Sequence, residues 1–141
     1  MLMTKIFMPS RWLPGLMLLI ASLPLMADSL RIEVDQLEKL IAQQDIKLID
    51  AREHNLYQQR HLADAVNLPA SLTYENSQQD GRVSSPISMQ RIFRQLGLRA
   101  DQPIIVYDNG AMLEAARVFW TLEVYGFSNV KVLNGGLAAW M

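Results

Sequence analysis

Short β-favouring runs alternate with helical stretches along most of this chain, and the alternation limits the fold classes open to it. The runs cover residues 32–34, 46–49, 66–68, 104–107 and 130–133. Between several of them, apolar residues recur at the spacing of one helix face. This order is typical of an α/β domain, in which helices connect parallel strands and cover both faces of a sheet. We therefore predict three layers, with a central, mainly parallel sheet flanked by helices.

The run 104–107 is the strongest predicted strand. It holds four β-favouring residues without charge, which is typical of the centre of a sheet whose two faces are covered. A polar loop, 108–110, follows it, and a helix is predicted at about 113–125. The buried face of that helix is expected to consist of Ala115, Val118, Phe119 and Leu122.

The remaining helix ends are predicted from their capping residues. Asp35 and Ser88 are the expected N-caps of two helices, because short polar side chains accept hydrogen bonds from the first turn. Residues 70–87 are polar and show no period, so we predict a surface loop. The last helical stretch, 137–140, is too short to be stable by itself, since helix nucleation is costly. We therefore expect the C-terminal helix to be truncated, as by a cut through a longer protein.

Residues 1–27 have the composition of a targeting segment. Lys5 and Arg11 precede an uncharged run of 14 residues, 12–25. A basic start, a short apolar centre and a small residue at the end describe a secretory signal peptide. The apolar run is shorter than the roughly 20 residues that a membrane-spanning helix needs. The alternative to a signal peptide is an uncleaved membrane anchor.

Cleavage is predicted after Ala27, which would make residues 28–141 a single exported domain, periplasmic or secreted. In that case the protein meets a membrane only transiently, through its signal peptide. The domain has 11 basic and 14 acidic residues, a net charge of −3. This mild acidity offers no electrostatic basis for binding nucleic acid.

The chain contains no cysteine. Disulfides, thiolate metal ligands and thiol nucleophiles are therefore excluded, although exported proteins usually meet conditions in which disulfides form. Its two histidines, His54 and His61, lie seven residues apart without a third ligand in the pattern, which is a poor basis for a metal site. We predict no metal and no cofactor.

Three segments, in order, resemble the rhodanese (sulfurtransferase) family. They are 48–53 with Tyr57 and His61, then 61–69, and finally 105–107, 126–127, Val130, 133–136 and Trp140. The resemblance implies a rhodanese-like three-layer α/β domain. The positions that it marks as structural are Asp50, Arg52, His61, Gly135, Gly136 and Trp140.

The neighbouring residues, and for His61 the resemblance, also carry expectations for individual side chains. Arg52, beside Asp50 and Glu53, is expected to form a buried or half-buried ion pair that ties two strands together. His61 is expected to pack in the core beside the sheet. The pair at 63–64 replaces the Pro-Gly that the family usually has, a change in a turn that leaves the fold expectation intact.

Active members of the family place the nucleophilic cysteine directly after the strand that ends here at residue 107. Counted forward from this strand the position is Asp108, and counted back from Gly126 it is Asn109. Neither residue carries a thiol, so neither forms a persulfide. We therefore predict no catalytic residue and no sulfurtransferase activity in this chain alone. The candidates for the anion-binding loop are Asp108, Asn109, Gly110, Glu114 and Arg117.

Each loop candidate has a functional and a plainer interpretation. The Asp108 carboxylate could accept the loop's N–H groups in place of an anion, or simply cap the helix that follows. Glu114 would favour the helix dipole but repel an anionic substrate such as thiosulfate. Arg117 could line the pocket or bind across a domain interface, and its alternative is a surface or ion-pair residue.

The order Tyr107-Asp108 followed by 115–120 is similar to the non-catalytic N-terminal half of tandem thiosulfate or 3-mercaptopyruvate sulfurtransferases. In those proteins an aspartate replaces the cysteine, and the reactive cysteine lies in a second rhodanese domain. The resemblance thus implies half of an exported tandem sulfurtransferase, with a catalytic domain in the same polypeptide as its partner. One alternative is a stand-alone binding module without catalysis. A weaker one is an enzyme with carboxylate chemistry at Asp108 and Glu114.

Overall fold

The structure, a computed structural model, describes residues 29–76 and 81–141. The predicted signal peptide lies outside the described residues, so its prediction stays untested. A single five-stranded sheet forms the centre, with strand order β1-β5-β4-β2-β3 and every neighbouring pair parallel. The strands are β1 (Arg31–Ile32), β2 (Lys47–Asp50), β3 (Val66–Asn67), β4 (Ile104–Tyr107) and β5 (Val130–Leu133).

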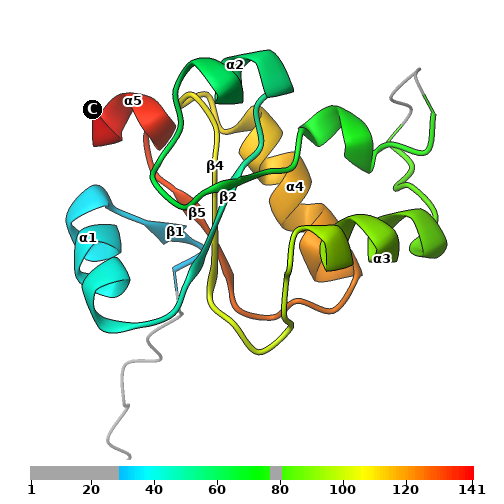
Figure 1. Cartoon of the computed structure of the whole chain (residues 1–141), viewed down its shortest axis with the longest axis horizontal. Helices are drawn as coiled ribbons and strands as arrows, with labels where there is room; N and C mark the ends of the chain where they lie inside the picture. Colours follow the sequence, from blue (N-terminus) through cyan, green and yellow to red (C-terminus); the bar gives the residue numbers. More distant parts are fainter. Residues whose placement is uncertain (1–28, 77–80) are drawn as a thin grey trace, which may run out of the picture.

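Helices cover both faces of the sheet. Figure 1 shows α1 (Val34–Gln43) and α5 (Gly136–Trp140) on one side, and α3 (Pro86–Gln95) and α4 (Leu113–Val124) on the other. The short α2 (His54–Gln59) lies at the end of the molecule towards which β2 and β4 run. The predicted three-layer α/β fold is confirmed.

β4 lies at the centre of the sheet and is buried along its whole length. Ile104 and Val106 pack with α3 and α4, whereas Ile105 and Tyr107 pack with α1 and α5. Because successive side chains of a strand point to opposite faces, a strand covered on both sides needs apolar residues at every position. This is the physical reason for the uncharged run in the sequence.

Two predicted N-caps are wrong by two or three residues. α1 is capped by Glu33 rather than Asp35, and the Glu33 N–H donates to the Gln36 side chain at 3.0 Å. α3 is capped by Ser85 rather than Ser88, and the Ser88 N–H donates to Ser85 Oγ at 3.4 Å. In α3 the first helical position is a proline, whose fixed φ suits that place.

The predicted loop at 70–87 is wrong in part. Residues Ala70–Thr73 form a 3₁₀ helix, η1, and Tyr74 pairs with Val83 in an antiparallel bridge. The Ser84 N–H also donates to Thr73 O at 2.8 Å. Backbone hydrogen bonds therefore join the start of this loop to its end. The spacing of apolar residues in the sequence does not predict them.

Within residues 29–76 and 81–141, no helix combines the length and apolar character needed to cross a membrane.

Candidate functional site

The candidate site is the loop that leaves the carboxyl end of β4 and enters α4. Asp108, its first residue, is only 1% exposed. One carboxylate oxygen accepts the Gly110 N–H at 2.7 Å, and the other accepts the Ala115 N–H at 3.2 Å. Ala115 lies in the first turn of α4, so the carboxylate sits at the positive end of that helix. A negatively charged group is therefore already held where such a loop would bind an anion.

The glycine pair before α5 forms the floor of this loop. Gly136 has φ +56°, and a Cβ placed there would clash with the carbonyl oxygen of Asp108 and lie 2.6 Å from the Gly110 nitrogen. The backbone also joins the two segments, since the Leu137 N–H donates to Asp108 O at 2.8 Å. Only a residue without a side chain permits this approach. The structure thereby explains Gly136 as a residue that shapes the site.

The two candidates for the cysteine position lie in different surroundings. Asp108 points inward and is buried, whereas Asn109 is exposed. Asn109 borders a shallow hollow of about 470 Å³. The other residues of this hollow, which we call the carboxyl-end hollow, are Arg52, Leu56, Gln59, Arg60, Leu137, Ala138 and Met141. Its lining contains two arginines and no aspartate or glutamate.

Glu114 is exposed at the second position of α4. With Glu53, Tyr74 and Arg117 it borders a smaller hollow of about 250 Å³. A carboxylate at a helix N-terminus is favoured by the helix dipole, as predicted. The two acidic residues make this smaller hollow less suited to an anion than the carboxyl-end hollow.

Arg117 is half-buried, and among residues 29–76 and 81–141 it forms no ion pair. Its guanidinium lies 3.8 Å from the centre of the Tyr74 ring. It donates to Thr73 Oγ1 (2.9 Å), Thr73 O (3.1 Å), Gly81 O (2.9 Å) and Arg82 O (3.1 Å). Since a guanidinium has five N–H groups, these four bonds leave little capacity for an anion. Arg117 holds Thr73, Gly81 and Arg82 against α4.

A buried ion pair lies below the loop at the end of β2. Arg52 Nη2 is 2.6 Å from Asp50 Oδ2, and Arg52 Nε donates to Asp50 Oδ1 at 3.0 Å. Hydrogen bonding to Asp50 raises the pKa of Arg52. Arg52 Nη2 also donates to Arg60 O at 2.6 Å. The predicted buried pair is present, but it ties β2 to the segment after α2 rather than to a second strand, and among the described residues none of its hydrogen bonds involves Glu53.

Tyr107, the last residue of β4, was missed as a site residue. Its hydroxyl accepts the Leu62 N–H at 3.0 Å, and its side chain is fully buried. Burial raises the pKa of this tyrosine. The phenol links the strand below the site to the turn at residues 62–65. The sequence does contain a signal for this role, because Tyr107 places a polar hydroxyl at the end of an otherwise apolar strand.

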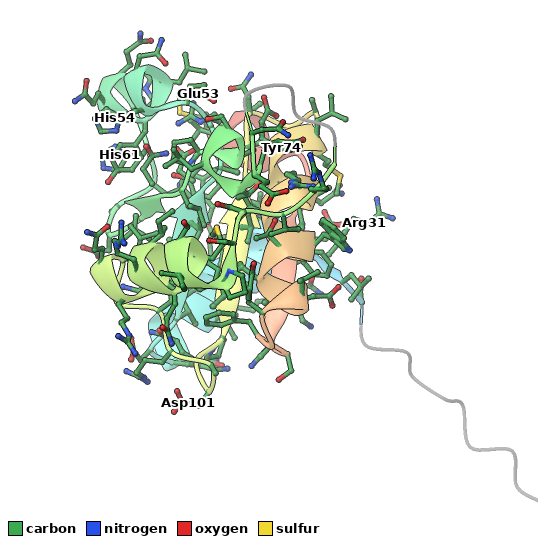
Figure 2. All side chains as sticks on the ribbon, turned by 90° about the vertical axis from the view of Figure 1, so that its right-hand side faces the viewer. Arg31, Glu53, His54, His61, Tyr74 and Asp101 are labelled. Atoms are coloured by element: carbon green, nitrogen blue, oxygen red, sulfur yellow. The ribbon has the colours of Figure 1, made fainter. Side chains whose placement is uncertain are left out.

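His61 is exposed, so the prediction that it packs in the core is wrong. Its ring stacks on Tyr57 with centroids 3.9 Å apart, and its Nδ1 lies 2.8 Å from Tyr57 O. Figure 2 shows His54 and His61 together on one side of the molecule. The reason is that α2 lies at the end of the sheet rather than in a covering layer. Among the described residues, no group of three or more His, Asp or Glu side chains is arranged to hold a metal.

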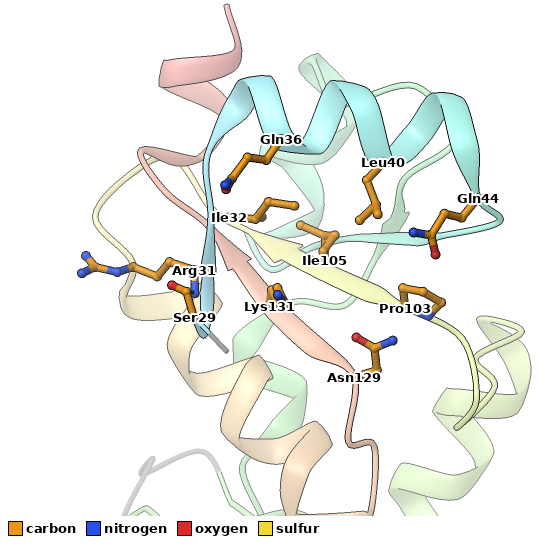
Figure 3. Close-up of a pocket in the computed structure, with 10 residues that line it drawn as sticks. All are labelled: Ser29, Arg31, Ile32, Gln36, Leu40, Gln44, Pro103, Ile105, Asn129 and Lys131. Carbon is orange, nitrogen blue, oxygen red and sulfur yellow. Dashed lines mark hydrogen bonds between the residues drawn. The ribbon is translucent and has the colours of Figure 1, made fainter. Parts of the chain in front are cut away.

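A separate hollow of about 430 Å³ lies under α1, at the amino ends of β4 and β5. Figure 3 shows Leu40 and Ile105 facing into it, while Arg31 points away. Lys131 also lines it, and its lining contains no carboxylate and no histidine. It lies at the opposite end of β4 from Asp108, so it is not part of the loop site.

Comparison with known proteins agrees with this geometry. The rhodanese-like domain model matches residues 33–141. The 3-mercaptopyruvate sulfurtransferase of Escherichia coli K12 is 32% identical over 117 residues, covering 75% of this chain and 42% of that protein. The thiosulfate sulfurtransferase of Pseudomonas aeruginosa is 27% identical over 111 residues, covering 78% and 41%.

Among solved structures, the crystal structure of SseA from Escherichia coli, described as a 3-mercaptopyruvate sulfotransferase, superposes with a TM-score of 0.69 at 30% identity. The match covers 79% of this chain and 48% of SseA. The chain thus spans less than half the length of the relatives that it matches. Because the family match extends over almost all of the described residues, this chain belongs to the rhodanese-like domain family.

Proposed function

We propose that this chain is the non-catalytic N-terminal half of an exported tandem sulfurtransferase that acts on thiosulfate or 3-mercaptopyruvate. One observation carries the proposal: the buried carboxylate of Asp108 takes the N–H groups of Gly110 and Ala115. In active members of the family a cysteine opens this loop. A carboxylate has no sulfur to form a persulfide, and no residue of this chain is a thiol. The thiol must then come from a second domain.

The relatives support a second domain of similar size. The two sulfurtransferases compared above are more than twice as long as the region that this chain matches, since the match covers 42% and 41% of them. A remainder of that length is enough for another domain with its own core. In our proposal this remainder supplies the catalytic cysteine.

The surface that the partner would cover lies at the carboxyl end of the sheet. Leu56 of α2, Leu113 of α4 and Met141 are 41%, 76% and 69% exposed. Leu56 and Met141 also border the carboxyl-end hollow. Exposed apolar side chains around a hollow are typical of an interaction surface. A catalytic domain seated here would bury them and face the Asp108 loop.

The charge of the carboxyl-end hollow suits an anionic sulfur donor. Arg52 is committed to Asp50, but Arg60 is exposed, and its Nη1 contacts the Met141 sulfur at 3.2 Å. In our proposal Arg60 attracts thiosulfate or 3-mercaptopyruvate to the boundary between the domains. A neutralised Arg60 should therefore raise KM for the donor more than it lowers kcat.

The first experiment measures the intact mass of the native protein captured from its own cells. We expect a mass well above that of residues 28–141, with a cysteine in the additional part. The purified chain should transfer no sulfur from thiosulfate or 3-mercaptopyruvate to cyanide above background, whereas the native protein should do so. Activity in the chain alone, or a native mass equal to residues 28–141, contradicts the proposal. The second result would favour a stand-alone binding module.

A paired substitution in the native protein tests the surface. Arg60→Gln is expected to raise KM for the anionic donor several-fold, and the effect should shrink at high salt because screening weakens charge attraction. Arg91→Gln is the matched control, since Arg91 is an exposed arginine on α3. Equal kinetics for the two variants would remove Arg60 from the proposal.

A further inference from the structure

The guanidinium of Arg52 keeps part of its hydrogen-bonding capacity unused. A guanidinium has five N–H groups, one on Nε and two on each terminal nitrogen. The Nε and Nη2 atoms donate to the Asp50 carboxylate, and Nη2 also donates to Arg60 O at 2.6 Å. Nη1 has no hydrogen-bond partner among the described residues. Two N–H groups of a charged side chain are therefore left open.

These open N–H groups are accessible from the carboxyl-end hollow. Arg52 is only 6% exposed, yet it is one of the residues that line this hollow. Among residues 29–76 and 81–141, Gln102 Oε1 is the one fully buried side-chain nitrogen or oxygen that lacks a partner. Arg52 Nη1 also lacks a partner, so it must retain solvent-accessible surface. Because Nε and Nη2 are turned towards Asp50, Nη1 is the part of the guanidinium that a ligand in the hollow can reach.

The position of this donor is fixed before any ligand binds. Asp50 is fully buried and holds the Arg52 guanidinium through two nitrogens, at 3.0 Å from Nε and 2.6 Å from Nη2. Figure 1 shows α2 and α5, which supply most of the remaining wall, at the same end of the molecule. A donor that is already ordered loses little conformational freedom on binding, which favours affinity.

Two exposed side chains add to this donor. Arg60 forms no ion pair among the described residues, and its Nη1 contacts the Met141 sulfur at 3.2 Å. The side-chain amide of Asn109 has no hydrogen-bond partner among the described residues. Since Asp50 balances the charge of Arg52, Arg60 gives the lining side chains a single net positive charge.

The rest of the wall restricts the kind of anion. Leu56, Leu137 and Ala138 form an apolar part of the lining. A short hydrocarbon body packs well against such a surface, because its burial removes apolar area from water. A dianion would lose more hydration than one net positive charge can compensate. The hollow therefore favours a monoanion that carries a small apolar body.

We propose that the carboxyl-end hollow binds a short aliphatic monocarboxylate in this domain alone. The carboxylate accepts hydrogen bonds from Arg52 Nη1 and the Asn109 amide, and Arg60 attracts it. The hydrocarbon body lies against the apolar part of the lining.

This inference deepens the anion-binding role proposed above for the hollow and rests on it for Arg60, but it requires neither a second domain nor a catalytic cysteine. The two proposals can therefore fail separately. A native mass equal to that of residues 28–141 would contradict the proposed function and leave this site standing. A purified chain that binds no carboxylate would contradict this site and leave the tandem protein standing.

The probe is butanoate, titrated into the purified chain and followed by NMR of the arginine side-chain nitrogens. The chain is amidated at Met141, because its terminal carboxylate would compete for the same arginines. We expect a saturable shift of Arg52 Nη1, larger than that of Nη2, with a Kd on the order of 1 mM. Neutral butanamide and dianionic sulfate should each bind at least about fivefold more weakly. No saturable shift at Nη1, or sulfate binding as tight as that of butanoate, overturns the proposal.

Two charge-matched variants test the location of the site. Asn109→Asp removes a donor and adds a negative charge to the hollow, so it should weaken butanoate binding at least about tenfold. Asn129→Asp makes the same change at an exposed position near the amino ends of β4 and β5 and should alter the Kd by less than about twofold. Circular dichroism checks that both variants are folded. Equal weakening by the two variants would mean that only the overall charge matters, which contradicts the site.

Arg60→Gln separates the attracting charge from the fixed donor. It should weaken butanoate binding about threefold and reduce its dependence on salt, because an exposed cation contributes modestly and is screened. The Arg52 Nη1 shift at saturation should stay the same, since the donor itself is unchanged. Loss of that shift in folded Arg60→Gln would show that Arg52 is not the donor.

Discussion

Removing the Asp108 carboxylate tests the central feature of the site. In Asp108→Ala the N–H groups of Gly110 and Ala115 lose their acceptor. Both bonds involve a charged acceptor, and one of them satisfies the first turn of α4. Alanine is too small to admit a strong replacement contact, so the two N–H groups would depend on water entering a buried position.

The magnitude follows from these two bonds. A hydrogen bond to a charged group contributes about 1.5–3 kcal/mol, and loss of a helix cap costs about 1 kcal/mol or more. The effects overlap, and part of the loss is offset because the carboxylate no longer has to be desolvated. We therefore expect Asp108→Ala to lower the free energy of unfolding by about 3 kcal/mol. Asp108→Asn keeps one oxygen acceptor and should lose about half as much.

Urea unfolding of the purified chain, followed by far-UV circular dichroism, measures this loss. With a slope of about 1.5 kcal/mol/M, a loss of about 3 kcal/mol lowers the midpoint by about 2 M. Glu114→Gln is the control for the helix dipole, because Glu114 is exposed and lies in the same helix turn. It should change stability by less than about 0.5 kcal/mol. An Asp108→Ala midpoint within error of the unmodified chain would refute a structural role for the carboxylate.

Three further predictions concern the residues around the loop. Gly136→Ala should lower stability by at least about 3 kcal/mol, because φ is +56° and a Cβ would meet the Asp108 and Gly110 backbone. Thermal unfolding measures this change, and an unchanged Tm contradicts it. Burial raises the pKa of Tyr107, so the folded state keeps a proton that the unfolded state releases near pH 10. Stability should therefore fall as pH rises through about 10, and Tyr107→Phe should fall less steeply in urea titrations at several alkaline pH values. Arg117→Ala should remove the contacts that hold Thr73, Tyr74, Gly81 and Arg82. Cleavage beside Tyr74 by chymotrypsin, which does not cut at arginine, should then become about tenfold faster, with little change in helix content. Arg91→Ala, on the exposed face of α3, should leave that rate unchanged.

Part of the site was predictable because it depends on neighbours in the sequence. Asp108 follows an uncharged strand and precedes a helix, so its place at the start of the loop could be expected. The ion pair of Asp50 and Arg52 also joins residues only two apart. In both cases the chain geometry alone brings the groups within reach.

Other contacts join residues too far apart for a local pattern to reveal. Arg117 binds Thr73, 44 residues earlier, and Tyr107 binds the Leu62 backbone, 45 residues earlier. The prediction that His61 is buried failed because it depended on where α2 lies relative to the sheet.

The amino-acid sequence by itself determined the fold class, the central place of β4 and the absence of a thiol. Those properties depend on residue type and on the period of apolar residues, which are local quantities. Tertiary structure alone decided that Asp108 points inward while Asn109 is exposed, and that Gly136 lies against the loop. Tertiary structure also decided which residues cap the helices, since several polar residues lie within a few positions of each helix start and could serve as caps. Packing of the helix against the sheet selects among them, because the free-energy difference between neighbouring caps is smaller than that of burying an apolar side chain.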